Sequence, residues 1–342
     1  MLLLGQDEIR ACFSMGEAID AVGEAFSLAS EKCADVPQRT VLARPELDAT
    51  LLVMPSYVPA GGRERADAAM GVKVLGVYPD NRRWGLPTTT AVMVVVDPDT
   101  GLVDALVDGT YLTRLRTGAA AGAATRLLAR PNARVGALLG TGGLALCQLE
   151  ALLCARKLEE VRLFSPHPEH ARELARLARK ELDLNRTTLV PCDSARACVE
   201  GADVITCATT SHEPVMEASW VKPGAHVNGV GSYTPNMREL PETLIARAEL
   251  ISVDSTDAVM AEDGTLIDAV ADGLVSRGDL VELGTLWDQA DGGASCLRGT
   301  PALPSDSTSV FKTVGIAVQD SVCAARIVRA ARERGVGREV EL

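Results

Sequence analysis

The sequence predicts an α/β protein whose larger part is a doubly wound parallel sheet. Three observations support this prediction: a glycine turn directly after the apolar run Val135–Leu139, an alternation of strands and helices from there to about Val253, and a β-rich segment from Arg39 to Val107. Alternating strands and helices fold through right-handed crossovers, which make the strands parallel and place helices on both faces of the sheet. At 342 residues the chain has room for about two domains.

The N-terminal segment begins with helix-forming sequence. Apolar residues from Ile9 to Phe26 recur with the period of an amphipathic helix, so we expect such a helix within the first 30 residues. After it, short runs of β-branched and apolar residues predict strands of a sheet. These runs are TVLA, LLVMP, GVKVLGVYP and TTTAVMVVVD. Gly61–Ala69 is expected to be a polar hairpin tip or loop, and Asp97–Gly101 a turn.

Helical sequence returns at Tyr111–Ala129, where the small residues of Gly118–Thr125 would let another element approach closely. Strands and helices then alternate. The expected strands are VGALLG, VRLFS, TTLVPC, ADVITCAT, AHVNGVG and AELISVD, and the expected helices run through Arg156, through Leu182 and from Ser194 to Val199. A last helix, Val314–Arg334, lies far beyond this region. If it returns to the first part of the chain, the N-terminal domain is discontinuous in sequence.

The turn at Gly140–Ala145 has the form G-x-G-x-x-A, which is typical of dinucleotide-binding sites. Gly140 permits the tight turn, Gly142 lets the backbone approach a pyrophosphate, and Ala145 lets the helix pack close to its strand. The helix N-terminus then offers free N–H groups to phosphate. A purely structural strand-to-helix turn is the alternative.

Composition and charge exclude several functions. With 46 acidic residues against 34 Lys and Arg, the formal net charge is −12, and no basic run offers a surface for nucleic acid or an anionic membrane. An anionic ligand must therefore be held by local cations. No segment reaches the roughly 20 apolar residues that a membrane helix requires, and the N-terminus lacks the apolar region of a signal peptide, so we expect a cytoplasmic protein.

The nine cysteines predict neither disulfides nor a metal centre. They are scattered singly from Cys12 to Cys323, without a C-x-x-C pair or a companion histidine spacing. We interpret them as buried thiols and expect no metal.

Several motifs together resemble one protein family. They are GVKVLGVYPDN, GLPTTTAVMVVVDPDTGLVDALVDG, LTRLRTGAA, LARPNARVGALLGTGGLA, ADVITCATTSHEP, WVKPGAHVNGVGSYTPNMREL and SVFKTVGIAVQD. In order and spacing they are similar to the ornithine cyclodeaminase/mu-crystallin family over nearly the whole chain. The resemblance implies a homodimeric NAD(P)-dependent enzyme whose substrates are amino acids or cyclic imino acids. It also implies a Rossmann-type domain, residues 129–313, inserted into an α+β substrate-binding and dimerisation domain formed by residues 1–128 and 314–342.

The resemblance places Arg39, Lys73 and Arg116 around a substrate carboxylate, as the catalytic residues. A buried carboxylate needs several donors, and the planar guanidinium offers two at once. The alternative is that all three are surface charges. For Lys73 the flanking Val72 and Val74 argue against it, because an apolar strand rarely tolerates an unpaired ammonium.

The resemblance also assigns cofactor contacts. It places Arg116-Thr117 near the cofactor phosphates and Thr88-Thr89 near the nicotinamide, while Ala208–Thr210 follow a strand at the carboxyl edge of the sheet, where ligands of doubly wound folds bind. Thr113 is interpreted instead as a residue that caps the start of its helix. The expected cofactor-binding residues are Thr88, Thr89, Arg116, Thr117, Gly140, Thr141, Gly142, Gly143, Leu144, Ala145, Ser165, Pro166, His167, Ala208, Thr209, Thr210, Val230 and Thr313.

The end of the second strand of the alternating region predicts the cofactor. Sites that prefer NAD usually carry an Asp or Glu there, which accepts both ribose hydroxyls, whereas this chain has Ser165-Pro166-His167. Because no carboxylate repels a 2′-phosphate and both Ser165 and His167 can donate to it, we expect NADPH to be preferred over NADH. The usual arginine is missing from this segment, and Arg172 is a possible second cation.

Departures from the family bear on the reaction. Its cyclodeaminases carry an aspartate where this chain has Tyr233 and a glutamate where it has Leu52. A phenol with a pKa of about 10 is a poor base at neutral pH, so elimination of ammonia is not favoured. Reduction of a carbon–nitrogen double bond next to a carboxylate needs only residues that bind the carboxylate and a proton source. We expect Lys73 or a bound water to be the proton source. The segment Ser232–Glu239 also resembles the imine-reducing members.

We therefore expect reduction of Δ1-pyrroline-2-carboxylate, Δ1-piperideine-2-carboxylate, or both, to L-proline and L-pipecolate, with NADPH or NADH as the reductant. Ornithine cyclodeaminase and alanine dehydrogenase activities are the enzymatic alternatives. A cofactor-binding protein of the mu-crystallin type, without turnover, is the non-enzymatic alternative.

Overall fold

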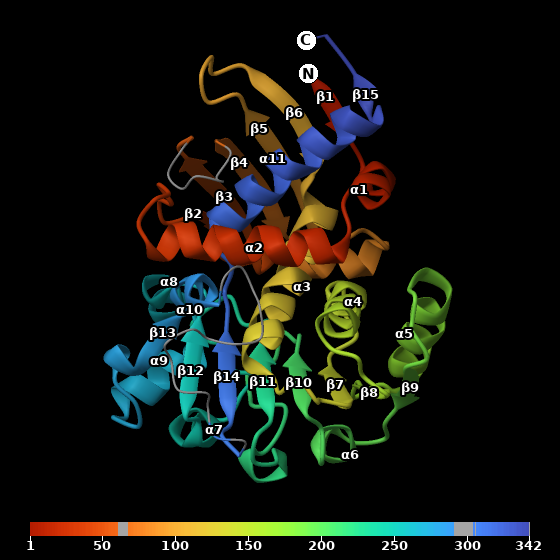
Figure 1. Cartoon of the computed structure of the whole chain (residues 1–342), viewed down its shortest axis with the longest axis vertical. Coiled ribbons are helices and arrows are strands. Elements are labelled where there is room, and N and C mark those ends of the chain that lie inside the picture. The colour runs from red at the N-terminus through yellow and green to blue at the C-terminus, as the bar shows by residue number, and fades with distance from the viewer. Residues whose placement is uncertain (61–67, 291–303, 305, 342) are drawn as a thin grey trace. The chain divides into compact units, whose positions relative to one another are not determined.

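The computed structural model describes residues 1–60, 68–290, 304 and 306–341, and the chain divides into two compact units (Figure 1). Unit 1 combines Met1–Arg116 with Ile316–Leu342, and unit 2 is Thr117–Gly315. The chain therefore passes between the units twice. The expected polar loop Gly61–Ala69 lies largely outside the described residues.

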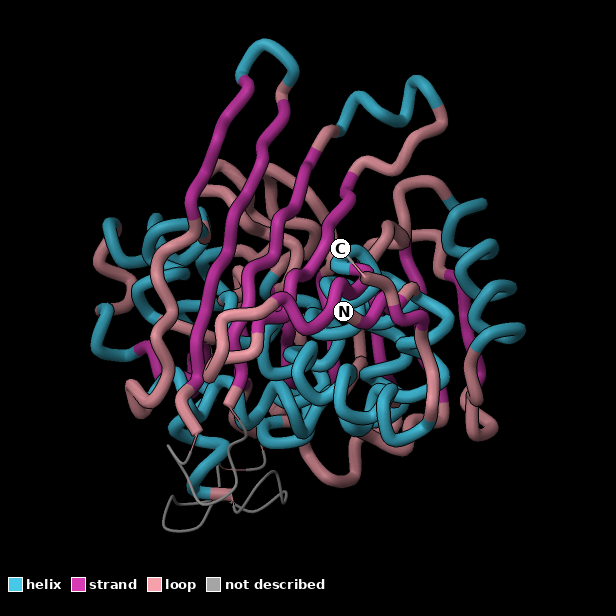
Figure 2. The backbone as a smooth tube through the Cα atoms, turned by 90° about the horizontal axis from the view of Figure 1, so that it is seen from above, coloured by secondary structure: helices cyan, strands magenta, loops and turns pink. Residues whose placement is uncertain are grey.

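Unit 1 is built on a seven-stranded sheet. Its strands are β1 (Leu2–Leu4), β2 (Thr40–Arg44), β3 (Ala49–Val58), β4 (Ala69–Val77), β5 (Thr89–Val96), β6 (Val103–Asp108) and β15 (Arg338–Glu339). Their order is β15-β1-β6-β5-β4-β3-β2, and neighbours are antiparallel except for the pair β1–β6. The two termini therefore lie side by side at one edge of this sheet (Figures 1 and 2). The four strands expected after the first helix are confirmed as β2 to β5.

The alternation of side chains along these strands decides which residues face the helices. Met54 is paired with Lys73, and Lys73 with Met93, so these three side chains share one face of the sheet. All three are buried there, where α11 (Ala317–Arg334) packs on β3 and β4 beside α2 (Met15–Ser30) (Figure 1). The C-terminal helix thus completes the core of the N-terminal sheet.

The N-terminal helical pattern differs from the expected single helix. It is divided into α1 (Gln6–Cys12) and α2, because Ser14 caps the second helix. The Ser14 hydroxyl accepts the Glu17 N–H (3.3 Å), and the Glu17 carboxylate accepts the Ser14 N–H (2.7 Å). This reciprocal arrangement is a capping box, which starts a new helix at Met15.

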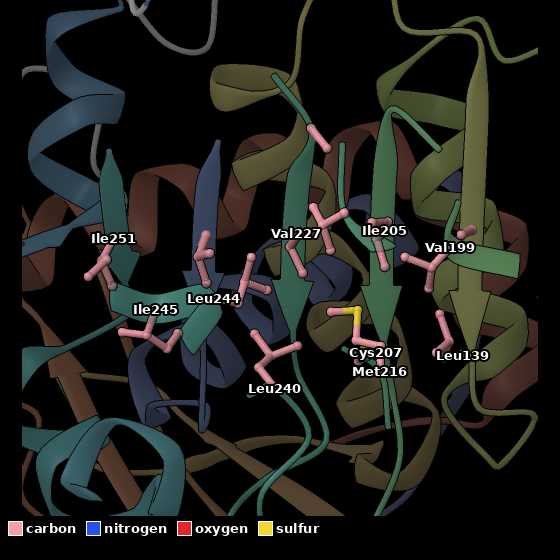
Figure 3. Close-up of a cluster of buried hydrophobic side chains, with 14 of the residues drawn as sticks. Leu139, Val199, Ile205, Cys207, Met216, Val227, Leu240, Leu244, Ile245 and Ile251 are labelled. Carbon is pink, nitrogen blue, oxygen red and sulfur yellow. The ribbon is translucent and has the colours of Figure 1, made fainter. Parts of the chain in front are cut away.

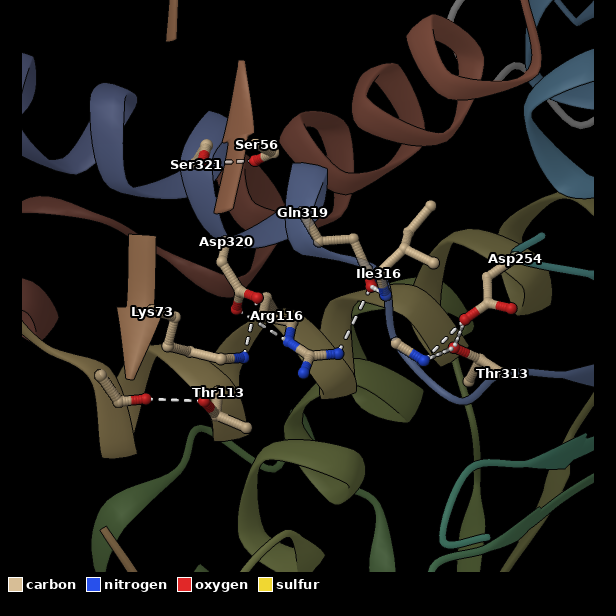
Figure 4. Close-up of polar contacts among 12 residues, drawn as sticks. Ser56, Lys73, Thr113, Arg116, Asp254, Thr313, Ile316, Gln319, Asp320 and Ser321 are labelled. Atoms are coloured by element: carbon tan, nitrogen blue, oxygen red, sulfur yellow. Dashed lines mark hydrogen bonds and ion pairs between the residues drawn. The ribbon is translucent and has the colours of Figure 1, made fainter. Parts of the chain in front are cut away.

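The C-terminal helix begins at Ala317 rather than at the expected Val314. The residues before it form a loop in which Gly315 has a φ of +81°, a conformation that favours glycine. In unit 2, the Asp254 carboxylate holds this loop by accepting the Thr313 hydroxyl (2.6 Å) and the N–H groups of Val314 (3.0 Å) and Gly315 (2.7 Å) (Figure 4). The helix cannot begin earlier because the positive φ of Gly315 lies outside the right-handed helical region.

Helix α3 (Gly109–Leu128) begins in unit 1 and ends in unit 2. Asp108 caps its first turn by accepting the Thr110 N–H (2.8 Å). The expectation that Thr113 caps the start of the helix is therefore wrong. The Thr113 hydroxyl donates instead to the Gly109 carbonyl (2.7 Å), one turn back along the helix.

Unit 2 is a parallel sheet covered by helices. Its strands are β7 (Val135–Leu139), β8 (Glu160–Phe164), β9 (Thr188–Pro191), β10 (Val204–Cys207), β11 (His226–Gly229), β12 (Leu250–Val253), β13 (Leu280–Glu282) and β14 (Ser309–Lys312). Their order is β13-β12-β14-β11-β10-β7-β8-β9, and every neighbouring pair is parallel. The chain winds outward from β7 through β8 and β9 and then returns to the other side of β7 with β10. The predicted doubly wound sheet is confirmed, and its switch point lies between β7 and β10.

Two strands of this sheet were not expected from the sequence. β13 has three residues, and β14 has four residues with polar side chains at both ends, Ser309 and Lys312. Neither shows the longer apolar run that is typical of a buried strand. β14 lies between β11 and β12, so this short segment occupies a central place in the sheet.

Helices cover both faces of the sheet of unit 2. They are the second part of α3, α4 (Ala145–Ala155), α5 (Pro168–Glu181), α6 (Ala195–Val199), α7 (Glu242–Arg247), α8 (Thr256–Glu262), α9 (Gly264–Ala271) and α10 (Leu283–Gln289). On one face, Ile205 and Val227 pack with Leu244 of α7 in a large buried cluster (Figure 3). At Gly118 a Cβ atom would stand 2.6 Å from the Cys147 carbonyl oxygen, so α3 and α4 approach each other closely at one of the small residues.

Three observations concern the described residues only. No helix among them is long and apolar enough to cross a membrane. The cysteines they include are all free thiols. They contain no group of three or more His, Cys, Asp or Glu side chains arranged to hold a metal ion.

Candidate functional site

A buried ionic cluster lies in unit 1 at Lys73, Arg116 and Asp320 (Figure 4). The Lys73 ammonium lies 2.7 Å from Oδ2 of Asp320, and the Arg116 Nε lies 3.1 Å from Oδ1 of the same carboxylate. The side chains of Lys73 and Asp320 are fully buried, and that of Arg116 is nearly so. The alternative of a surface charge is therefore excluded for both Lys73 and Arg116.

Each member of the cluster comes from a different element. Lys73 lies in the middle of β4 on the face that α11 covers, Arg116 lies in α3, and Asp320 lies in the first turn of α11. An ammonium in this apolar strand would be costly without a counter-ion, and Asp320 supplies it. One carboxylate thus holds together segments that are far apart in sequence.

The surroundings of Lys73 change its acid–base behaviour. The pKa of the Lys73 ammonium is lowered to about 7, mainly by burial and then by the positive charges of Arg116 and, to a smaller extent, Arg39, while Asp320 opposes the shift. Arg39 is half-buried. Two cations, Lys73 and Arg116, share the one carboxylate of Asp320, so this cluster has an excess of positive charge, which attracts an anion. A lysine with a pKa near 7 can also release a proton at neutral pH.

Gln319 orients the guanidinium of Arg116. Its side-chain Oε1 accepts from Nη1 of Arg116 (3.3 Å) and from the backbone N–H of Ile316 (2.9 Å) (Figure 4). Asp320 and Gln319 therefore hold two of the guanidinium nitrogens, Nε and Nη1. This leaves the remaining donors of the planar group to a ligand.

Sequence reasoning assigned no role to Asp320 or Gln319, although it used the segment SVFKTVGIAVQD to identify the family. Two signals were present in the sequence. An acid and an amide stand together near the start of a helical segment, directly after the apolar residues Ile316–Val318, and a lysine flanked by Val72 and Val74 requires a counter-ion from elsewhere in the chain.

The glycine turn of unit 2 has the geometry that its pattern predicts. β7 ends at Leu139, and α4 begins at Ala145. Gly140 has a φ of +107°, and a Cβ atom there would stand 2.4 Å from the Ala208 carbonyl oxygen, so the turn after β7 contacts the loop after β10 at the switch point. A Cβ at Gly142 would meet no heavy atom within 4 Å. The backbone is therefore open at Gly142, as the approach of a pyrophosphate requires.

A buried carboxylate joins the loops that follow β10 and β11. Glu239 accepts the N–H of Thr209 with Oε1 (2.5 Å) and the N–H of Gly231 with Oε2 (2.6 Å). A Cβ at Gly231 would stand only 1.9 Å from the Thr209 carbonyl oxygen, so glycine is required where these loops meet. Burial raises the pKa of Glu239. Glu239 thus shapes the carboxyl edge of the sheet, a role that sequence reasoning did not foresee.

A second buried ion pair lies close to Glu239. The Lys312 ammonium, at the end of β14, lies 2.7 Å from Oδ2 of Asp263, and both side chains are fully buried. The pKa of Lys312 is raised: burial alone would lower it, but the negative charges of Asp263 and Glu239 outweigh that effect. Lys312 therefore compensates part of the negative charge that is buried beneath these loops.

Ser165 and His167 lie directly after β8. Ser165 is buried, and its hydroxyl accepts the His167 N–H (3.3 Å), which leaves the hydroxyl proton available for a ligand. The His167 ring is exposed and lies 3.7 Å from the carboxylate of Glu169, in the first turn of α5. Arg172, one turn farther along this helix, is exposed.

The other expected site residues are placed as follows. In unit 1, the Thr88 carbonyl accepts the Tyr78 N–H, and Thr89 begins β5. In unit 2, Thr117 and Val230 are buried, and Thr313 donates its hydroxyl proton to Asp254. The structure thus brings Lys73 and Arg116 together in unit 1. In unit 2 it brings the glycine turn into contact with the loop that contains Ala208 and Thr209.

The two positions that depart from the cyclodeaminases also differ from each other. Leu52 is buried and packs with Met54, Leu75 and Ala317 in the core of unit 1. Tyr233 lies in the loop after β11 and is partly exposed. At Leu52 the chain therefore places an apolar side chain in a closed core.

The lowered pKa of Lys73 makes the stability of the protein depend on pH. Below about pH 7 the lysine is charged in both states, so folding carries the full cost of burying an ammonium. Between a pKa of about 7 when folded and the ordinary 10.5 when unfolded, only the unfolded chain holds the proton, and the free energy of unfolding rises with pH.

We predict that Lys73→Met removes this rise. The stability of the variant minus that of the wild type should decrease on the order of 1 kcal/mol per pH unit between about pH 7.5 and 9.5, measured by urea unfolding. Taking the difference between the two free energies of unfolding removes the pH dependence that comes from groups that titrate equally in both proteins. A difference that does not change with pH would contradict the lowered pKa of Lys73.

Comparisons with known proteins find relatives along the whole chain. A sequence model of the ornithine cyclodeaminase/mu-crystallin family matches residues 1–335. A Δ1-pyrroline-2-carboxylate reductase of Bacillus cereus is 35% identical over 342 residues, which cover 100% of each chain.

Solved structures share the fold. The Δ1-pyrroline-2-carboxylate reductase of Thermococcus litoralis, in complex with NADH and L-proline, has a TM-score of 0.88 and 32% identity, covering 99% of this chain and 100% of that one. An archaeal alanine dehydrogenase, a dimer with bound NAD, has a TM-score of 0.83 and 29% identity, covering 100% of this chain and 99% of that one. The chain belongs to the ornithine cyclodeaminase/mu-crystallin family.

Proposed function

We propose that this protein is a ketimine reductase that converts Δ1-pyrroline-2-carboxylate, Δ1-piperideine-2-carboxylate, or both, to L-proline and L-pipecolate. The observation that carries the proposal is the buried cluster of Lys73, Arg116 and Asp320, which has an excess of positive charge and a lysine with a pKa near 7. Its relationship to reductases of Δ1-pyrroline-2-carboxylate, one of them in complex with NADH and L-proline, supports the same assignment.

The residues of unit 1 account for substrate binding and for the proton. Arg116 and Lys73 bind the substrate carboxylate, and Arg39 adds to the positive charge around it. A bound nicotinamide supplies a hydride to the imine carbon. Lys73, or a water that it holds, gives a proton to the imine nitrogen, so the carbon–nitrogen double bond becomes a single bond and the product is a neutral secondary amine before any further protonation.

The residues of unit 2 account for the cofactor. The turn Gly140–Ala145 and the N-terminus of α4 bind the pyrophosphate, and Ala208–Thr210 with Val230 line the nicotinamide half at the carboxyl edge of the sheet. In this proposal unit 1, together with the neighbouring part of α3, is the substrate domain, and unit 2 is the nucleotide domain, with functional boundaries at 1–128 plus 314–342 and at 129–313. Thr88, Thr89 and Thr117 complete the contacts.

Cyclodeamination fits this chain less well. It needs a base at the substrate amine, where this chain has Tyr233, and an acid where it has Leu52, which is buried in an apolar cluster. Alanine dehydrogenase remains a second candidate because of the structural similarity to a member with that activity. The residues that bind the substrate carboxylate and the nicotinamide cofactor would serve the alanine dehydrogenase reaction in the same way.

The decisive experiment follows the reduced nicotinamide by absorbance with each cyclic imine, with pyruvate and ammonia, and with L-ornithine. We expect both imines or one of them to be reduced, and L-ornithine to release no ammonia. Formation of ammonia and proline from L-ornithine without net cofactor turnover would contradict the reductase assignment. Tight binding of NADPH without any imine reduction would favour a cofactor-binding protein instead.

In the same assay, Lys73→Ala should lower kcat/KM for the imine by roughly 100-fold or more, because it removes a carboxylate ligand and the proton source. Its affinity for the cofactor should stay close to that of the wild type. Lys157→Ala, which removes an exposed lysine in unit 2, is the matched control. Unchanged imine reduction by Lys73→Ala would remove Lys73 from the site.

We further propose that NADPH is preferred over NADH, because the position after β8 carries Ser165 rather than a carboxylate. Ser165→Asp should reverse the preference, lowering the ratio of kcat/KM for NADPH to that for NADH on the order of 10-fold or more, since the new carboxylate repels a 2′-phosphate and accepts ribose hydroxyls. Ser194→Asp, at the cap of α6, is a control for the added charge. A wild-type protein that prefers NADH would overturn the proposal.

The protein is also proposed to be a homodimer. The face of the unit 1 sheet opposite α11 carries apolar side chains on adjacent strands. These are Leu51, Val53 and Tyr57 of β3, Met70, Val72 and Val74 of β4, and Val92, Val94 and Val96 of β5, all half-buried or exposed. A continuous apolar sheet face of this kind favours a protein partner. A second copy is the natural occupant because a structural neighbour of this chain is a dimer.

Val92→Lys should weaken this dimer, since it places an ammonium on a side chain that is 39% exposed in the single chain. Light scattering after gel filtration at several concentrations would measure the mass. Leu177→Lys, at a leucine of α5 in unit 2 that is 42% exposed, is the matched control and should leave the mass unchanged. A wild-type protein that is a monomer at all concentrations would contradict the proposal.

A further inference from the structure

We infer that Gln319 is a ligand of the substrate carboxylate, donating from Nε2 beside Arg116 and Lys73. The inference rests on the proposed function, since it assigns one more residue to the same site. It concerns a residue that sequence reasoning did not select. Two independent features of the structure support it: the orientation of the Gln319 amide and the absence of an acceptor for its Nε2 atom among the described residues.

The orientation of the amide is determined by its neighbours. Oε1 receives the backbone N–H of Ile316 (2.9 Å) and the Nη1 of Arg116 (3.3 Å), and both partners are donors only. Exchanging the oxygen and the nitrogen would place an NH2 group against two donors. The amide therefore has one acceptable orientation, with Nε2 on the side away from these two groups.

Nε2 of Gln319 is buried and has no hydrogen-bond partner among the described residues. The whole residue is excluded from solvent, so its two N–H groups would remain unsatisfied in the folded chain. Asp320, the adjacent acid, is not the acceptor either: its two oxygens receive Arg116 and Lys73, and neither receives Nε2 of Gln319. The missing acceptor must therefore come from a ligand or from water.

The position of this donor identifies the kind of ligand. Because Oε1 contacts the Arg116 guanidinium and both amide atoms are bonded to one carbon, Nε2 belongs to the same buried cluster, although it points away from the guanidinium (Figure 4). Gln319 also lies in the first turn of α11, where the helix dipole favours negative charge. Lys73, Arg116 and Gln319 together present donors only. A carboxylate, which has two oxygens that each accept more than one hydrogen bond, matches this set.

The role of Oε1 can be separated from that of Nε2 by one substitution. Gln319→Glu keeps an oxygen for the Ile316 N–H and for Arg116, so the positioning of the guanidinium is retained. It replaces the two N–H donors with a second carboxylate oxygen, which repels the substrate carboxylate. A merely structural role for Gln319 predicts unchanged substrate binding in this variant, whereas the inference predicts a specific loss.

The test measures KM for Δ1-pyrroline-2-carboxylate, cofactor affinity by nucleotide fluorescence, and thermal unfolding. We expect Gln319→Glu to raise KM at least 10-fold while cofactor affinity stays within 2-fold. Gln319→Met, which is neutral and similar in size, should also raise KM and keeps the test valid if the buried carboxylate prevents folding. Gln289→Glu, an exposed position in α10, controls for the change in net charge. An unchanged KM in either folded variant would overturn the inference.

Direct binding of L-proline separates this inference from the proposed function. Calorimetric titration of the cofactor-loaded protein with L-proline needs no turnover, so it can succeed even if no imine is reduced. Weaker binding of L-proline to Gln319→Glu than to the wild type supports the role of Gln319, whatever reaction the protein catalyses. Equal binding to both proteins, or no binding to the wild type, overturns it.

Discussion

The carboxylate of Asp320 is the constraint on which the architecture of unit 1 depends. It lies between the Lys73 ammonium (2.7 Å) and the Arg116 Nε (3.1 Å), and it is the counter-ion of both groups. Removing one member of a buried pair leaves an uncompensated charge, which is far more costly than losing an exposed ion pair. The position of α11 on the sheet is therefore fixed by charge as well as by apolar packing. The C-terminal segment belongs to the N-terminal unit for the same reason.

Two buried carboxylates of unit 2, Glu239 and Asp254, serve a different purpose, because they hold backbone N–H groups. Glu239 binds the N–H groups of Thr209 and Gly231, and Asp254 binds those of Val314 and Gly315. Loops at the carboxyl edge of a parallel sheet cannot satisfy their N–H groups within the sheet, so buried acceptors stabilise them. These loops include positions that we propose for the cofactor. Rigid loops at such positions reduce the ordering that binding requires.

Sequence reasoning was most successful where the signal was local. The glycine turn, the strand before it, the helix after it and the apolar strand around Lys73 are each specified by neighbouring residues, and the structure contains all of them. It failed where a role depends on long-range packing: Asp320 is 247 positions from Lys73, and the residues around Lys73 indicate that a counter-ion is needed but not which residue provides it. The break at Ser14 was missed although its capping box is local, because the apolar period continues across it. β14 was missed because its four residues, with a polar side chain at each end, are too few to show the apolar run of a buried strand.

Under the proposed function, the same contacts would favour an imino acid over a diamino acid as the substrate. A substrate amine that is charged at neutral pH needs a carboxylate whose charge is not already compensated. In unit 1 the Asp320 carboxylate is already paired with both Lys73 and Arg116, so the cluster as a whole would repel a second cation. An imino acid needs no carboxylate at its nitrogen, because its own carboxylate is bound by hydrogen-bond donors and its ring nitrogen must receive a proton. A lysine whose pKa is lowered to about 7 can hold the carboxylate in its charged form and can still release that proton. In the proposed reaction the excess of positive charge would bind the substrate carboxylate, and the burial that lowers the pKa of Lys73 would suit the same residue to proton transfer.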